Sequence, residues 1–397
     1  MKRVRAAVTG LGCICAAGPS LEQAMRAMYS GQRFPAAPTR FQLDLDQTYP
    51  VFEVRQELEG LCERMHDGPV TRTMQLAFVA TQEALQQAAL DRSVLQRRRV
   101  GVCLGTTVGC TLNDERFYRE LRAGSTPEMG AVDRYLTNNP GAHLAEALGA
   151  DGPVATVTNA CSSGADAIGL AKAWLETGEC DLALAGGCDE LSRIPCLGFA
   201  QLLIAAPEPC RPFDRRRRGL NLGEGAGIVV LEREDVARER RAPVLAYAAG
   251  YATHADAYHP TAPHPEGLGL RRAIRDALCH AEIAPEQVSF VSAHGTSTID
   301  NDRVEGRALA EMLPDNVPIV ATKAYTGHTL GAAGALQAVF AVQALVDQHL
   351  PATAGFEEPD SEVGRVPTRT NLTVSARVAL SNSLAFGGNN SVLVLSR

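Results

Sequence analysis

The sequence predicts an α/β fold in which mixed, mainly parallel sheets are covered by helices. Segments typical of strands and of helices alternate along the chain, as they do where helices connect parallel strands. The chain also looks like two distant copies of one unit. Apolar residues 154–158 lead through a turn into a helix rich in small residues, and residues 318–321 begin the same pattern again. In sheets of this kind, ligand sites lie beyond the strand ends.

The length of 397 residues suits one large domain or two fused halves. The charged segment 232–241 is typical of a helix and forms a natural midpoint. We therefore predict an N-terminal half of residues 1–241 and a C-terminal half of residues 242–397.

Composition excludes several classes of protein. The net charge of −7 gives no support for a nucleic-acid partner, which would need a basic face. No run of about 18 uncharged apolar residues predicts a membrane span. The N-terminus lacks the long apolar segment of a signal peptide, so we expect a cytoplasmic protein. The eleven cysteines show no C-x-x-C pair, which favours reduced thiols over disulfides or a metal site.

In the N-terminal half, residues 6–18 predict a strand that runs into glycines. The third glycine and the acidic residue of a dinucleotide fingerprint are missing, so no dinucleotide cofactor is expected. The Pro-rich residues 31–60 predict an irregular surface excursion. Periodicity predicts further strands over 100–104, 154–158, 182–185 and 228–231, and helices over 21–29, 74–89, 140–148 and from 165 onward.

In the C-terminal half, the first expected strand covers residues 244–251. Two apolar runs, 288–291 and 318–321, predict short strands, and residues 379–388 with 391–395 read as a closing strand pair. Helical spacing predicts helices over 268–281, 303–313 and 332–346; the last is packed with Ala and Gly, which predicts close neighbours.

Cys161 lies where the strand 154–158 becomes a helix. A thiol at a helix N-terminus meets unpaired backbone N–H groups and the positive end of the helix dipole. Both favour the thiolate, which is the nucleophilic form. The alternative is a buried and inert cysteine.

Two histidines, His294 and His328, each follow a predicted strand. One cysteine and two histidines at strand ends suit an acyl thioester on sulfur and a carbonyl polarised by two imidazoles. A single histidine in such a place is more often a satisfied polar residue, so the hypothesis depends on the three occurring together.

Four motifs make the sequence resemble the β-ketoacyl-[acyl-carrier-protein] synthases, the condensing enzymes of fatty acid and polyketide synthesis. They are residues 160–164 around Cys161, residues 294–298 with Asp302 and Glu305, Lys323 with 327–328 and 331–334, and residues 386–390. They occur in the family's order, and lesser matches cover essentially the whole chain. The resemblance implies the thiolase fold, a duplicated five-layered αβαβα arrangement, and a decarboxylative Claisen condensation with malonyl carrier.

The resemblance also implies catalytic roles. Cys161 would carry the acyl chain, and its backbone N–H with that of Phe386 would form an oxyanion hole. His294 and His328 would donate to the thioester oxygen of malonyl carrier while CO2 leaves. Lys323 would need a partner if buried, and Glu305 is the family's candidate.

Further positions would bind substrate. Thr296 and Thr298 resemble the hydroxyls that hold the phosphopantetheine arm of an acyl carrier protein. Thr261 belongs to a loop near the mouth of that tunnel, and Val108 is expected to limit acyl chain length. Phe386, followed by Gly387 and Gly388, resembles the gating aromatic of the acyl tunnel.

Some positions depart from the family pattern. Ala385 and Asn389 replace the usual Gly and Thr beside the gating Phe, and Arg218 stands where an acidic residue is usual. An alanine at 385 is expected to stiffen the loop. The arginine run 215–218 would either meet an acidic carrier protein or form internal salt bridges on a solvated loop.

The favoured reading is an elongating β-ketoacyl synthase that needs no metal or other cofactor and works on acyl carrier protein, as a homodimer or beside a chain-length-factor-like paralogue. The runner-up is a dedicated ketosynthase of an aryl polyene or type II polyketide pathway. A non-catalytic chain-length factor is less favoured because it lacks the nucleophile. A thiolase or priming synthase would carry a second catalytic Cys or an Asn in place of His328.

Overall fold

A computed structural model of the chain describes residues 4–62, 70–109, 115–130, 132 and 139–397. Its main feature is one ten-stranded sheet with the strand order β3-β2-β4-β5-β1-β6-β12-β11-β7-β8. The strands of the N-terminal half are β1 (Ala6–Cys15), β2 (Val100–Gly105), β3 (Val154–Val157), β4 (Leu182–Asp189) and β5 (Gly225–Arg233). Those of the C-terminal half are β6 (Ala246–Ala255), β7 (Phe290–Ser292), β8 (Ile319–Val320), β11 (Val378–Ala385) and β12 (Asn389–Ser396). A separate pair consists of β9 (His349–Leu350) and β10 (Leu372–Thr373).

The two halves of the sheet repeat one topology. Read from its outer edge inward, the first half runs β3-β2-β4-β5-β1, and the second runs β8-β7-β11-β12-β6. In the first, β2 is parallel to β3 and β4, while β5 is antiparallel to β4 and β1. The second matches it, with β7 parallel to β8 and β11 and with β12 antiparallel to its neighbours. Four of the five strands in each half therefore point the same way, which confirms the predicted mixed, mainly parallel duplication.

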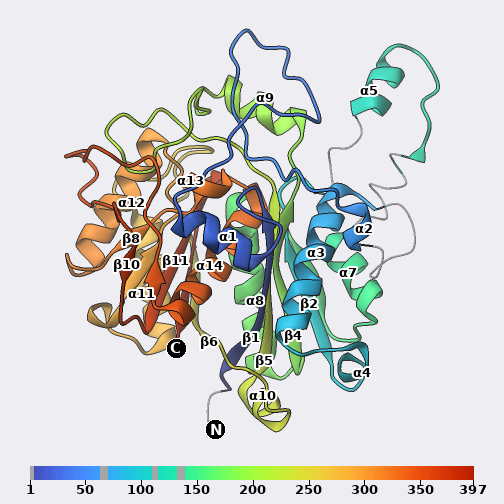
Figure 1. Cartoon of the computed structure of the whole chain (residues 1–397), viewed down its shortest axis with the longest axis vertical. Helices are drawn as coiled ribbons and strands as arrows, with labels where there is room; N and C mark the ends of the chain where they lie inside the picture. The colour runs from blue at the N-terminus through green and yellow to red at the C-terminus, as the bar shows by residue number, and fades with distance from the viewer. Residues whose placement is uncertain (1–3, 63–69, 110–114, 131, 133–138) are drawn as a thin grey trace.

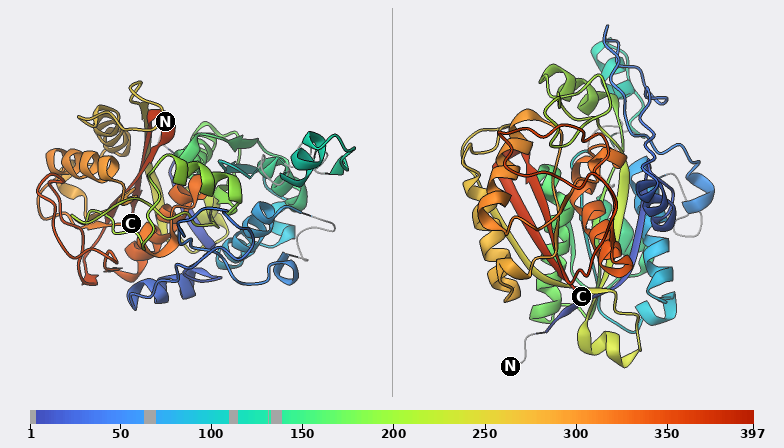
Figure 2. Two further views of the ribbon diagram at one scale, coloured as in Figure 1. Left: turned by 90° about the horizontal axis from the view of Figure 1, so that it is seen from above. Right: turned by 60° about the vertical axis from the view of Figure 1, so that its left-hand side comes forward.

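Five layers follow from how the helices pack. In the middle lie α8 (Ser163–Thr177) and α14 (Ala333–Asp347), which contact each other and strands of both halves. On one outer face α3 (Arg72–Gln87) and α7 (Pro140–Leu148) enclose an apolar cluster with β2, β4 and β5. On the other face α11 (Leu268–Ala281) and α12 (Ile299–Met312) do the same with β7, β11 and β12. Figures 1 and 2 show the two halves side by side with α8 and α14 between them.

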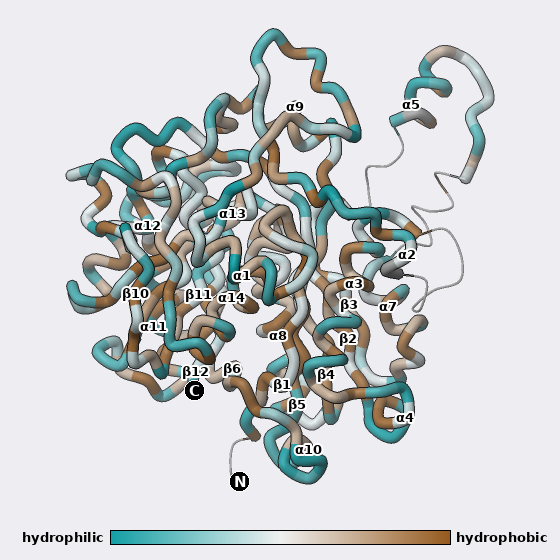
Figure 3. Tube along the Cα trace, viewed as in Figure 1, coloured by the Kyte–Doolittle hydropathy of each residue, from teal (hydrophilic) through white to brown (hydrophobic). Residues whose placement is uncertain are grey.

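Glycines let the two central helices approach closely. A Cβ atom added at Gly164 would lie 2.7 Å from the carbonyl oxygen of Gly331, and one added at Gly334 would lie 2.9 Å from the Cβ of Ala165. Residues 330–347 are apolar enough to cross a membrane, but 83% of that window is buried in the protein. It is therefore the core helix that the small residues predict. Figure 3 shows apolar residues along the central elements, whereas α10 (Glu234–Glu239) is mainly polar and α4 (Arg92–Leu95) is mixed.

Most predicted elements lie where expected, and two differences have physical causes. Helix α12 begins at Ile299 rather than at 303, because Asp300 and Asp302 occupy its first turn, where acidic residues are favourable. The irregular segment 31–58 is only partly a surface excursion. Its end is core, since Phe52 is fully buried and donates its N–H to the carbonyl of Leu222. The remaining helices are α1 (Leu21–Tyr29), α2 (Glu59–Cys62), α5 (Glu115–Arg122), α9 (Arg193–Gln201) and α13 (Lys323–Thr326).

Candidate active site

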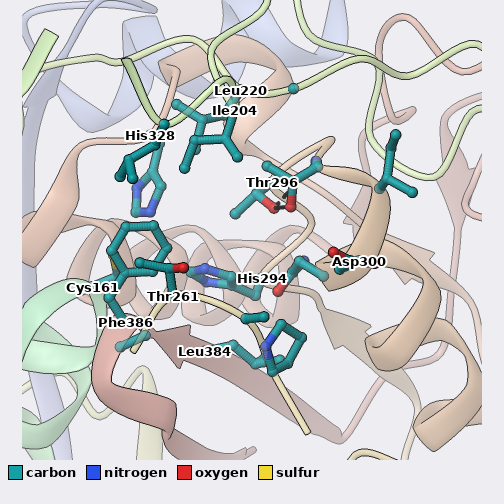
Figure 4. A pocket seen from close by; sticks show the side chains of 18 of the residues that line it. Cys161, Ile204, Leu220, Thr261, His294, Thr296, Asp300, His328, Leu384 and Phe386 are labelled. Carbon is teal, nitrogen blue, oxygen red and sulfur yellow. Dashed lines mark hydrogen bonds between the residues drawn. The ribbon is translucent and has the colours of Figure 1, made fainter. Parts of the chain in front are cut away.

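Three segments that are distant in sequence meet at one pocket. Cys161 follows β3, His294 follows β7, and His328 follows β8 and the short helix α13. All three residues are buried, and all three line the same pocket of about 310 Å³ (Figure 4). The imidazole centroids lie 5.4 Å apart, with the rings nearly perpendicular. The convergence expected of these residues is therefore present in the fold.

A tight turn presents Cys161. The residue before it, Ala160, has a φ of +48°, and Asn159 donates its N–H to Ser163 Oγ at 2.7 Å. The carboxylate of Asp166 then accepts from Asn159 Nδ2 at 2.7 Å and from Ser162 Oγ at 2.8 Å. These bonds end the strand and start α8 at the same point, which places the sulfur beside the helix N-terminus.

The Cys161 thiol is protonated in the resting site. Burial raises its pKa to about 11, although the Lys323 charge and the backbone N–H groups of Phe386 and Cys161 act to lower it. The backbone N–H groups favour the thiolate as expected, but desolvation outweighs them in the resting state. The two N–H groups that face the sulfur are the ones the resemblance implied for the oxyanion hole.

His294 is a neutral imidazole with a fixed tautomer. Lys323 Nζ lies 3.1 Å from its Nδ1, and burial together with the Lys323 charge lowers the pKa of His294 well below its usual value. An ammonium group can only donate, so Nδ1 is the acceptor and Nε2 carries the proton.

His328 reaches the same tautomer by another route. The backbone N–H of Leu330 donates to His328 Nδ1 at 3.2 Å, which leaves the proton on Nε2. Burial and the Lys323 charge lower the pKa of His328 well below its usual value. Figure 4 shows both rings reaching into the pocket beside Cys161 and Phe386. The two neutral rings therefore present their Nε2–H groups to the pocket as hydrogen-bond donors.

Glu305 supports His294 rather than pairing directly with Lys323. Its carboxylate accepts the backbone N–H groups of His294 and Gly295, each at 2.8 Å, and the Asn382 side chain at 3.2 Å. The three contacts of Lys323 Nζ are instead His294 Nδ1, the His294 carbonyl and Gln337 Oε1. The predicted Lys323–Glu305 pair therefore acts through space. Burial lowers the pKa of Lys323 to about 8, and the Glu305 charge acts to raise it.

The Phe386 ring closes one side of the pocket. It stacks on Phe199 with centroids 5.5 Å apart. Gly387 and Gly388, at φ +83° and +79°, do not line this pocket; they form the turn that follows Phe386. Ala385 has extended backbone at φ −126°, so an alanine there introduces no strain, and the expected stiffening of the loop stays a prediction.

The predicted substrate residues fall into two groups. Thr261, Thr296 and Thr298 line the pocket, and the hydroxyl oxygens of Thr296 and Thr298 lie 2.8 Å apart. Val108 does not line it. It packs against a separate apolar cluster that contains Leu220 and that Phe199 also contacts.

Sequence reasoning missed several residues that shape the site. Asp189, at the end of β4, accepts N–H groups from Thr107 at 2.8 Å and Gly331 at 2.6 Å, and so joins turns of the two halves. Burial raises the pKa of Asp189 to about 6. The sequence signal for Asp189 was an acidic residue at the end of an apolar strand. Phe199 and Gln337 carry no such local signal, because a single aromatic or amide on a helix is ordinary.

The arginine run is mostly paired within the chain. Arg215 and Arg216 contact Glu358 and Glu357, and Arg217 reaches Asp360 at 2.6 Å. This confirms the salt-bridge alternative for these three. Arg218 is also paired, with Glu208 at 3.7 Å, but its side chain is 73% exposed and it lines the pocket. In the described part of the chain, no group of three or more His, Cys, Asp or Glu residues could hold a metal ion.

Comparison with known proteins agrees with this geometry. The models of the beta-ketoacyl synthase N-terminal and C-terminal domains match residues 3–237 and 245–357. The chain is 33% identical to "3-oxoacyl-[acyl-carrier-protein] synthase 2" of Synechocystis, with 100% of this chain and 99% of that protein covered.

Solved structures extend the comparison. The ishigamide ketosynthase/chain length factor superposes with a TM-score of 0.92 at 34% identity, covering 99% of both chains. A type II polyketide ketosynthase in complex with its acyl-carrier protein gives a TM-score of 0.90 at 27% identity, covering 100% of this chain and 99% of that one. This chain belongs to the beta-ketoacyl synthase family.

Proposed function

We propose that the chain is a β-ketoacyl-[acyl-carrier-protein] synthase that condenses an acyl group on Cys161 with malonyl carrier. The observation that carries this proposal is the pocket itself. It holds one thiol facing two backbone N–H groups and two neutral imidazoles with the proton on Nε2. A thiol supplies the covalent site for an acyl group, and the imidazoles supply donors for a developing enolate.

In the first half-reaction, Cys161 sulfur attacks the carbonyl carbon of an acyl carrier thioester. The new oxyanion takes the N–H bonds of Cys161 and Phe386, the carrier sulfur leaves, and the thiol proton of Cys161 goes to it. Neither histidine has a free nitrogen to accept this proton, because both Nδ1 atoms are occupied and both Nε2 atoms already carry protons.

In the second half-reaction, the thioester oxygen of malonyl carrier accepts from Nε2 of His294 and His328. The bond to the carboxylate breaks, CO2 leaves, and its electron pair forms an enolate held by the two donors. Each donor contributes roughly 3 kcal/mol to such a transition state. The enolate carbon then attacks the acyl carbonyl, the Cys161 sulfur leaves, and a proton from water restores the thiol.

The proposal extends to the residues that bind the carrier and to the partners of the enzyme. We propose that Thr296 and Thr298 bind the amides of the phosphopantetheine arm, that Thr261 lies at the tunnel mouth, and that Val108 bounds the acyl chain. The partner is an acyl carrier protein. The enzyme works in the cytoplasm as a homodimer. Each chain consists of two halves, residues 1–241 and residues 242–397. The stacking of the half-buried Phe199 and Phe386 rings supports a gate that opens when the acyl chain enters.

A second candidate has specific support. Two structural relatives, the ishigamide ketosynthase/chain length factor and the type II polyketide ketosynthase with its acyl-carrier protein, favour a dedicated polyketide ketosynthase in a heterodimer. A non-catalytic chain-length factor is disfavoured, because Cys161 is present and faces both N–H donors. Assays with malonyl carrier and saturated or polyunsaturated acyl carriers, read by mass spectrometry of Cys161, separate the two catalytic readings.

The central test is Cys161→Ala. We expect acyl transfer and condensation to be lost, since no sulfur remains to form the thioester, while CO2 release from malonyl carrier persists. Radiolabelled acyl transfer and CO2 release measure the two steps. Cys180→Ala is the matched control, because Cys180 is equally buried at the far end of α8 and should retain both activities. Full condensation by Cys161→Ala would refute the proposal.

The imidazoles are tested separately with His294→Ala and His328→Ala. Each change removes one donor to the enolate, so CO2 release should fall by about a hundredfold or more. Acyl transfer to Cys161 should fall much less, because its oxyanion uses backbone donors. Normal CO2 release by both variants would contradict the assigned roles.

A further inference from the structure

Gln337 is a fully buried amide on the first turns of α14, directly against the site. Its exposed fraction is 1%, and it contacts Lys323, β7 and β11. We propose that Gln337 is a positioning residue: it holds the Lys323 ammonium so that the proton of His294 stays on Nε2, facing the substrate. This inference rests on the proposed function, because it explains how one of the two enolate donors is kept in the correct tautomer.

The orientation of the Gln337 amide is fixed from both sides. Its Nε2 faces the backbone carbonyls of Ala293 and Asn382, each at 3.0 Å, and that of Ser292 at 3.4 Å. Its Oε1 accepts from Lys323 Nζ at 2.6 Å. A flipped amide would set oxygen against the carbonyls and NH2 against an ammonium, so only one arrangement satisfies these atoms.

The anchored oxygen determines where the ammonium points. Lys323 Nζ has three N–H groups, and its three acceptors are Gln337 Oε1, the His294 carbonyl at 2.6 Å and His294 Nδ1 at 3.1 Å. Of these, Gln337 is the acceptor that does not belong to His294. With two N–H groups committed, the third is directed at Nδ1. A deprotonated Lys323 could instead accept from Nδ1, which would permit the wrong tautomer.

The neutrality of the amide matters as well as its shape. The charged and titratable groups that act on Lys323 come from several elements: Glu305 and Asp302 on α12, Cys161 before α8, and Cys210 on the loop before β5. His294 is also acted on by His328. None of these groups accepts a hydrogen bond from Lys323 Nζ, whereas Gln337 Oε1 accepts one at 2.6 Å. A carboxylate at 337 would hold the positive charge on Lys323 to higher pH, whereas an apolar side chain would release it at lower pH.

The test uses two near-isosteric variants, Gln337→Glu and Gln337→Met, in the full chain. CO2 release from malonyl carrier is measured between pH 6 and about 10. The alkaline limb reports loss of the Lys323 proton. We expect this limb to move up by about one pH unit or more in Gln337→Glu and down in Gln337→Met. A purely structural role would lower the rate without moving the limb.

The control is Gln343→Glu, the same substitution on the same helix, at a partly exposed residue that contacts Asp347 rather than the site. Its profile should match that of the wild type. Alkaline limbs that stay in place in both Gln337 variants, or that move in the same direction, would overturn the inference. Wild-type protein without CO2 release would instead refute the proposed function.

A second measurement needs no turnover. In protein labelled with ¹⁵N-histidine, the resonances lost in His294→Ala identify His294. We expect the pattern of an Nε2-protonated neutral ring in the wild type at pH 7. A ring protonated on Nδ1, or an imidazolium, would overturn the inference even if the variants at 337 did not fold.

Discussion

Burial decides the chemistry of the individual residues in this site. Enclosure in a low-dielectric pocket disfavours every charged form, so Cys161 stays a thiol and His294 and His328 stay neutral. Backbone and ammonium donors then decide which nitrogen of each ring carries the proton. For the imidazoles this is the useful state, since an uncharged ring that donates from Nε2 can bind an enolate oxygen. For Cys161, burial means that the thiol loses its proton only as the sulfur attacks the acyl carbonyl.

The raised pKa of Cys161 can be tested by measuring how its reactivity changes with pH. Because its pKa is raised to about 11, the thiolate fraction and the rate of iodoacetamide alkylation should rise about tenfold per pH unit from pH 7 to 10. Mass spectrometry of the Cys161 peptide separates it from the exposed Cys279. Lys323→Ala should slow alkylation near pH 7, where the Lys323 charge lowers that pKa, and much less at pH 10, where Lys323 has lost its proton. A plateau below pH 9 would show that the thiolate exists at rest.

At the scale of elements, the site is built from strand ends and two glycine-lined helices. The segments that follow β3, β7 and β8 meet at one pocket, and α8 and α14 start beside it. Their starts face each other through Gly164, Ala165, Gly331 and Gly334. Close contact of these helices therefore sets the separation between the Cys161 turn and the His328 turn.

Gly334→Ala tests this helix contact. The added Cβ would lie 2.9 Å from the Cβ and the backbone nitrogen of Ala165, so the helices must separate. We expect a loss of about 1–3 kcal/mol in the free energy of unfolding, measured in urea, together with reduced condensation. Gly198→Ala in α9 is the matched control, because its Cβ would meet open space; it should gain up to about 1 kcal/mol. Equal effects at both positions would disprove the packing argument.

On the scale of the whole molecule, each half supplies what the other lacks. The N-terminal half carries the sulfur, and the C-terminal half carries both imidazoles and the lysine. Buried carboxylates join the halves near the site. Asp166, next to the Cys161 turn, accepts from Tyr251 on β6 at 2.8 Å and from Ser391 on β12. Asp189 links the turn after β2 to Gly331.

Asp166→Asn tests this junction. Each carboxylate oxygen of Asp166 accepts two donors, so an NH2 in place of either oxygen faces donors on both sides. We expect the free energy of unfolding to fall by about 2–3 kcal/mol, seen as a lower urea midpoint. Glu179→Gln, at an exposed position just after α8, should stay within about 0.5 kcal/mol of the wild type. An unchanged midpoint for Asp166→Asn would show that the bridge contributes nothing.

Much of this was readable in the sequence where a signal is local. The bounds of α1 and α11, the duplicated strand–turn–helix units, and Cys161, His294 and His328 as one site were all predicted. Where several groups compete in three dimensions, prediction failed. The desolvation that opposes a Cys161 thiolate, and the contacts of Lys323 with Gln337 and His294, are the instances.

The amino-acid sequence by itself determined the fold class, the duplication and the identity of the reacting groups, because periodicity, glycines and motif spacing are properties of short stretches. Only the tertiary structure decided the protonation states, the Gln337–Lys323–His294 contact and the acidic partners of the four arginines. Those depend on burial and on partners tens to hundreds of residues away. Desolvation and hydrogen-bond geometry arise only once the two halves are packed together.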